Sequence, residues 1–97
     1  MKIAGWEVTQ ELIDAVSAKL RGRQFDAEFV RAVARETGLL PGVEDCIDVR
    51  YVREEIGTRL IDYFKRTKQI EKVPRTRKWR WAFDSLVARA TDTGGEA

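Results

Sequence analysis

The sequence contains no histidine and a single cysteine, Cys46. Histidine is the commonest general base and the commonest metal ligand, so its absence argues against most acid–base catalysis and most metal sites. One thiol forms no disulfide within the chain and builds no thiolate metal site by itself. Carboxylates, lysines and the serines Ser17 and Ser85 are left for catalysis. We therefore expect a protein that is not an enzyme, with no catalytic residue, metal or cofactor.

Long apolar stretches are also missing. No run approaches the roughly 20 residues that a membrane-spanning helix needs. The opening segment Met1–Trp6 is too short and too polar for a signal peptide, and a lone cysteine fits a reducing compartment. We therefore expect a cytoplasmic protein that makes no contact with a membrane.

The chain has 97 residues, of which 43% are hydrophobic and 35% are charged. A chain of this length forms one domain and buries roughly two-thirds of the surface that its unfolded form exposes. We expect one domain over residues 1–90, with a small core under a highly charged surface. Residues 84–90 are expected to form one or two helical turns, and residues 91–97 a flexible polar tail.

Three helix starts share one pattern: an apolar residue, a capping residue with a side-chain oxygen, and a second apolar residue four positions after the cap. The pattern occurs at Val8-Thr9 with Ile13, at Phe25-Asp26 with Val30, and at Ile47-Asp48 with Val52. It predicts helices over residues 10–21, 27–37 and 49–67. Gly22 and Gly38 are expected to end the first two helices, because glycine adopts a left-handed conformation at little cost.

The helix predicted over residues 49–67 has two unlike faces. The apolar face contains Val49, Val52, Ile56, Leu60, Tyr63 and Phe64, and the opposite face contains Arg50, Tyr51, Glu54, Thr58, Ile61, Asp62 and Lys65. Gly57 lies mid-helix, where it costs about 1 kcal/mol relative to alanine. Two explanations are open: close packing against another helix, or close approach of the backbone to a ligand.

Residues 39–46 are expected to link the second and third helices. Pro41-Gly42 is a turn signal, and Leu39 and Leu40 are expected to pack beneath the turn. We expect Cys46 to be a half-buried apolar residue with no reactivity. The acidic pair Glu44-Asp45 is expected to be solvated or to cap a helix.

Two short strands are predicted after the third helix, over residues 70–73 and 79–83. Trp79, Trp81 and Phe83 share one face of the second strand, because side chains alternate along a strand. An isolated hairpin is marginal, so this aromatic face is expected to close the core against the helices; a platform for base stacking is the alternative. Trp6 either closes the far side of the core or leads into a third strand.

Positive charge gathers around the turn between these strands, Pro74–Lys78, which we call the basic turn. Between Lys65 and Arg80 the only acid is Glu71, and the basic residues are Lys65, Arg66, Lys68, Lys72, Arg75, Arg77, Lys78 and Arg80. This segment carries +7 and the whole chain carries +2, so the rest carries −5. A local positive field on an acidic body attracts a polyanion. The alternative is a solvated surface without a partner.

The element order resembles the winged-helix branch of the helix-turn-helix DNA-binding proteins, in their small phage and bacterial forms. The likeness covers residues 9–83 and is carried by Phe25-Asp-Ala-Glu-Phe-Val30, Arg53-Glu-Glu-Ile-Gly-Thr-Arg-Leu60, Thr67-Lys-Gln-Ile-Glu-Lys-Val73 and Lys78-Trp-Arg-Trp81. It implies a mostly α fold with a small antiparallel β-hairpin (α+β), in which three helices support a two-stranded wing. It also implies binding to double-stranded DNA, as a transcription regulator or an accessory factor.

The resemblance assigns DNA contacts to two regions. The third helix would enter the major groove, with Arg50, Tyr51, Arg53, Thr58 and Arg59 near base edges or phosphates. The wing would hold phosphates through Arg75, Thr76, Arg77, Lys78 and Arg80, with Lys65 beside it. Many such proteins form homodimers that read two half-sites, so a homodimer is a further expectation.

One feature departs from this family pattern. Between Asp48 and Phe64 the third helix carries three arginines and four acids, and so a net charge of −1. Pairs between Arg50 and Glu54 and between Glu55 and Arg59 are expected, each four residues apart, and they would occupy arginines that base reading needs. The alternative function is a winged-helix module that binds a protein, such as a phage-encoded inhibitor of a host complex, through the outward-facing Tyr51 and Ile61.

Overall fold

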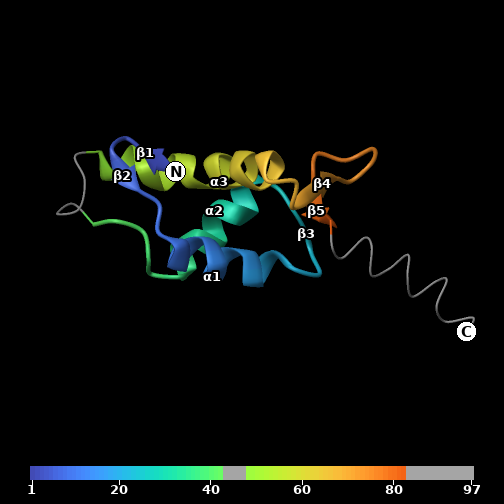
Figure 1. Ribbon diagram of the computed structural model, residues 1–97, viewed down its shortest axis with the longest axis horizontal. Coiled ribbons are helices and arrows are strands. Elements are labelled where there is room, and N and C mark those ends of the chain that lie inside the picture. The colour runs from blue at the N-terminus through green and yellow to red at the C-terminus, as the bar shows by residue number, and fades with distance from the viewer. Residues whose placement is uncertain (43–47, 83–97) are drawn as a thin grey trace, which may run out of the picture.

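A computed structural model describes residues 1–42 and 48–82 of the chain (Figure 1). The described elements, in chain order, are β1 (Lys2–Ile3), β2 (Trp6–Glu7), α1 (Gln10–Leu20), β3 (Gln24–Phe25), α2 (Ala27–Glu36), α3 (Val49–Arg66), β4 (Ile70–Lys72) and β5 (Trp79–Trp81). This is an α+β fold with three helices and a small antiparallel sheet, as expected. The predictions for Glu44-Asp45, Cys46, Phe83, residues 84–90 and the tail 91–97 lie outside the described residues.

All three predicted helix starts are confirmed. The Thr9 side chain accepts a hydrogen bond from the Leu12 amide at 3.1 Å. Asp26 accepts one from the Phe29 amide at 2.8 Å, and Asp48 accepts one from the Tyr51 amide at 3.1 Å. Each bond satisfies an amide hydrogen that the first turn leaves without an intrahelical acceptor.

The left-handed residue that follows each helix is glycine after α1 and α2 but lysine after α3. After α1 and α2 the chain turns at Gly22 (φ +77°) and Gly38 (φ +71°), as predicted. After α3 the left-handed residue is Lys68 (φ +59°), and the Gln69 amide donates back to the Phe64 carbonyl at 2.9 Å. The observed helices end one residue earlier than predicted, since Arg21, Thr37 and Thr67 act as C-caps.

The sheet that follows α3 has three strands in the order β3-β5-β4, both pairs antiparallel. The pairing of β4 with β5 confirms the predicted hairpin. The third strand, β3, lies between α1 and α2 in the sequence and places Phe25 opposite Trp79. It was not predicted, because two residues are too few to show an alternating pattern.

Trp6 belongs to a separate hairpin at the start of the chain. β1 pairs with β2 through a two-residue turn in which Ala4 (φ +50°) and Gly5 (φ +82°) are both left-handed, the geometry of a type I′ turn. The hairpin lies against α3 (Figure 1), and Ile3 is 1% exposed in the common core.

The aromatic face of β5 closes the core, as predicted. Trp81 is 5% exposed and packs edge-to-face on Phe64, with ring centroids 5.2 Å apart. Trp79 is half-buried beside it. Burial on this scale leaves no room for a base on Trp81, so the alternative of a stacking platform does not apply to that residue.

The prediction that Ile61 faces outward is wrong, because its side chain is buried in the core at 7% exposure. It lies one helical turn after Gly57 and so on the same side of α3. At Gly57 a β-carbon would collide with the Ala27 carbonyl oxygen and lie 3.1 Å from the Arg31 β-carbon. Gly57 therefore permits close packing of α2 on α3, the first of its two explanations, and Ile61 is buried on the same side of α3.

Among the residues that the structure describes, no helix is long and apolar enough to cross a membrane.

Candidate nucleic-acid interface

The basic turn is held by its own backbone and by one side chain. The Val73 amide donates to the Lys78 carbonyl at 3.0 Å. The Thr76 hydroxyl donates to the Val73 carbonyl at 2.9 Å and accepts from the Lys78 amide at 3.1 Å. Thr76 was predicted as a DNA contact, and its hydroxyl instead serves to shape the turn.

Three cations of the basic turn, Arg75, Arg77 and Lys78, are exposed. None of them forms an ion pair with a carboxylate of residues 1–42 or 48–82. Arg75 has a left-handed backbone, with φ +66°. The turn extends beyond the sheet and away from the three helices (Figure 1), so its charges are accessible to a large partner.

Arg80 is placed differently from the other predicted wing residues. It lies opposite Glu71 across the β4–β5 pair, and its Nε donates to the Glu71 Oε1 at 2.9 Å. Both side chains are only about one-third exposed. A charge-assisted hydrogen bond of this kind holds the guanidinium in the sheet, which removes Arg80 from the readily available phosphate ligands.

Trp79 brings together two lysines from different elements. The ammonium groups of Lys65, in the last turn of α3, and Lys72, in β4, each lie 5.0 Å from its ring centroid. A cation at this distance is attracted to the ring by about 0.5–1 kcal/mol at an exposed site. The interaction uses no acceptor atom, so both ammonium groups keep their hydrogen-bond donors for an anion.

The arginines of α3 are largely engaged within the protein. The expected pairs are confirmed, with Arg50 to Glu54 at 3.4 Å and Arg59 to Glu55 at 3.7 Å. Arg53 donates through Nε and an η-nitrogen to the Pro41 carbonyl, at 3.4 and 3.3 Å.

Tyr51 and Arg59 form one further contact on the exposed face of α3. The Tyr51 hydroxyl accepts a hydrogen bond from Arg59 at 3.3 Å. That bond, helped by Glu55 and Asp62, raises the pKa of the Arg59 guanidinium above its ordinary value. Thr58 is exposed. The predicted base-reading residues therefore lie on one helix, but their hydrogen-bonding groups are mostly directed at the protein itself.

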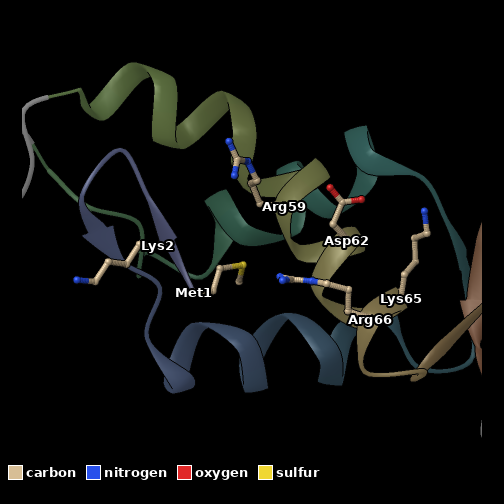
Figure 2. A pocket seen from close by; sticks show the side chains of 6 residues that line it. All are labelled: Met1, Lys2, Arg59, Asp62, Lys65 and Arg66. Carbon is tan, nitrogen blue, oxygen red and sulfur yellow. The ribbon is translucent and has the colours of Figure 1, made fainter.

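A groove of about 530 Å³ lies between the last two turns of α3 and the N-terminal strand (Figure 2). Its lining consists of Met1, Lys2, Arg59, Asp62, Lys65 and Arg66. Four of these are basic and one is acidic. Figure 2 shows Arg66 extending from α3 toward Met1, with Asp62 between Arg59 and Lys65. Lys2 was not among the predicted contacts, because no sequence signal connects it with α3. Arg66 was counted in the charge of the segment from Lys65 to Arg80 but was not predicted as a contact.

Groups of three or more potential metal ligands do not occur in the part of the chain that the structure describes. The sequence matches no protein-family model, and comparisons with curated proteins and with solved structures find no similar chain.

Proposed function

We propose that this protein binds double-stranded DNA, chiefly through the phosphate backbone, with the basic turn and the C-terminal end of α3 as its contact surface. The observation that carries the proposal is the charge of Arg75, Arg77 and Lys78, on a turn that extends beyond the sheet. These side chains are exposed and pair with no carboxylate of residues 1–42 or 48–82. Lysine and arginine side chains that neutralise phosphates release counterions, and this release provides most of the affinity of non-specific DNA binding.

Backbone geometry supports selection for charge at this surface. Lys68 and Arg75 have left-handed backbones, at φ +59° and +66°, where an L-residue other than glycine costs about 1–2 kcal/mol. At comparable positions after α1 and α2 the chain has glycine. Of the three left-handed residues other than glycine among the described residues, Ala4 belongs to the N-terminal hairpin and the other two are cations of this segment, which supports a use for those cations outside the fold.

The arrangement of the elements supports a winged-helix assignment. Strand β3 between α1 and α2 pairs with β5, and the hairpin β4–β5 follows α3 directly, so that the basic turn takes the place of the wing. One feature departs from it: residues 37–48 separate α2 from α3, whereas a helix-turn-helix joins its helices by about three or four residues.

The arginines of α3 contact other groups of the protein, which favours binding to the DNA phosphate backbone over recognition of a base sequence. Reading a guanine edge takes an arginine whose donors are free for two parallel hydrogen bonds. Arg50, Arg53 and Arg59 each have an internal partner. We therefore propose a DNA-binding accessory protein with weak sequence preference in place of a regulator that recognises one operator.

The alternative of a protein-interaction module loses one of its two anchors, because Ile61 is buried. Tyr51 remains, as the exposed large apolar residue of the described chain at 39%. A single tyrosine whose hydroxyl is bonded to Arg59 is a small anchor for a protein partner, because interface energy concentrates in clusters of buried aromatic residues and arginines.

Fluorescence anisotropy on a generic duplex tests the proposal. Wild type should bind at about 50 mM salt and lose affinity steeply toward about 200 mM, and Arg75→Ala with Arg77→Ala should lower the log–log salt slope by about 2, since each phosphate contact contributes about 0.9. The matched control, Lys19→Ala with Arg35→Ala, removes two exposed charges from the ends of α1 and α2. Absence of wild-type binding, or an equal loss in the control, would overturn the proposal.

A further inference from the structure

We infer that the groove between α3 and β1 is a second phosphate site, which extends the DNA contact from the basic turn across the last two turns of α3 to the N-terminal hairpin. The inference rests on the proposed function and names residues outside the predicted surface, Lys2 and Arg66. Its starting point is the groove lining, which contains four basic residues, Lys2, Arg59, Lys65 and Arg66, and a single acid, Asp62.

Lys65 joins the groove to the basic turn. Its side chain lines the groove, and its ammonium lies 5.0 Å from the ring centroid of Trp79. Trp79 begins β5, the strand that immediately follows the basic turn. One lysine therefore belongs to both surfaces, and a polyanion held by the turn and by Lys72 reaches the groove through Lys65 without crossing an uncharged gap.

The groove cations are available to a ligand. Lys2 and Arg66 are exposed and pair with no carboxylate of the described residues. Arg59 lies 3.7 Å from Glu55 and donates one bond to Tyr51, which leaves part of its fork of five N–H donors. Four cations spread along one groove with one acid favour an extended polyanion over a single small anion, and the phosphates of a duplex backbone meet that requirement.

Removal of the Asp62 charge tests the inference, because it should raise duplex affinity instead of lowering it. Its carboxylate lies within the basic lining (Figure 2), so it repels any phosphate that enters. Asp62→Asn should therefore tighten duplex binding severalfold at about 50 mM salt. Glu11→Gln, which removes an exposed acid from the first turn of α1, is the control and should leave duplex affinity unchanged.

The opposite variant is Lys2→Ala with Arg66→Ala. It should weaken duplex binding and lower the salt slope by about 2, as the two substitutions in the basic turn do, and the effects of the two pairs should add, since distant sites are independent. All three substituted groove residues are exposed, and urea unfolding of each variant checks that the fold is kept.

The outcomes separate this inference from the proposed function. If wild type binds duplex and the basic-turn variant weakens it, but Asp62→Asn and the Lys2/Arg66 variant bind as wild type does, the groove inference is wrong and the proposed function stands. If wild type does not bind duplex at all, the proposed function is wrong first. Inorganic phosphate bound in the groove, with duplex affinity indifferent to Lys2 and Arg66, would assign the groove to a small anion and overturn the inference.

Discussion

At the scale of single residues, the backbone conformation of Arg75 favours glycine, whereas the proposed DNA contact requires a cation there. Pro74 and Arg75 are the central residues of a tight turn whose Thr76 amide donates to the Val73 carbonyl at 3.3 Å. Proline at the first central position and a positive φ at the second are the features of a type II turn, which favours glycine at the second. The chain has an arginine there, with φ +66°.

We predict that Arg75→Gly makes the protein more stable and a weaker DNA binder. Relief of the left-handed strain, less the extra entropy that glycine gives the unfolded chain, should raise the free energy of unfolding by about 0.5–1 kcal/mol. Duplex affinity should fall as it does for Arg75→Ala. Urea unfolding and anisotropy measure the two quantities.

Arg77→Gly is the control for this prediction, because Arg77 has no positive φ and glycine there should lower stability. A loss of stability in Arg75→Gly would contradict the idea that charge at this position is kept against the preference of the backbone.

At the scale of elements, the approach of α2 to α3 depends on one missing side chain. A β-carbon at Gly57 would collide with the Ala27 carbonyl oxygen in the first turn of α2. The helix axes can come this close only where a residue is small. Ile61, one turn later on the same side of α3, is buried. The long third helix is thereby fixed to the scaffold near its middle, with its C-terminal end leading into the sheet.

We predict that Gly57→Ala destabilises the protein by about 1–3 kcal/mol, the usual cost of forcing atoms into a packed interior. This exceeds the gain of about 1 kcal/mol that alanine brings to a helix interior, because the obstacle is backbone and not the flexible end of a side chain. Thr58→Ala, at the exposed neighbouring position, has the propensity gain without the collision and should be neutral or stabilising. Equal stability of the two variants in thermal or urea unfolding would contradict the close packing.

At the scale of the whole molecule, charge is segregated along the chain. The segment from Lys65 to Arg80 carries +7 and the remainder −5. The basic turn, Lys72 and the C-terminal end of α3 lie together at one end of the described fold (Figure 1). Surface charges of this kind contribute little to folding but act strongly on a polyanion.

We therefore predict that added salt weakens duplex binding strongly but changes the stability of the fold little. Between about 50 and about 200 mM, duplex affinity should fall roughly a hundredfold if four phosphates are neutralised, whereas the melting temperature should shift by only a few degrees, because exposed ion pairs are worth about 0–1 kcal/mol each. Anisotropy titrations and thermal melts in the same buffers measure both. A duplex affinity that does not depend on salt would contradict backbone binding.

Much of the fold could be predicted from local sequence. Interactions between residues close together in the sequence leave a recognisable pattern in the order of amino acids. Such patterns predicted the capping residues Thr9, Asp26 and Asp48, the glycines that follow α1 and α2, and the pairing of β4 with β5. The ion pairs of α3 were predictable for the same reason, since their partners stand four positions apart.

Two further features could have been predicted from the sequence but were not. Arg80 and Glu71 face each other once the hairpin register is drawn, and the register alone would have paired them. Ala4-Gly5 lies between two short strands that each contain one charged residue and one apolar residue, and it is a recognisable hairpin turn.

The amino-acid order alone is enough to predict the type and position of the described helices, the hairpin after α3 and the concentration of positive charge beside it, because each is set by neighbours along the chain. Three features required the folded chain: β3 completes the sheet, Ile61 faces inward, and Lys2 and Arg66 line the same groove. These outcomes depend on contacts between residues far apart in the sequence, where packing of one element on another overrides the polarity pattern of either.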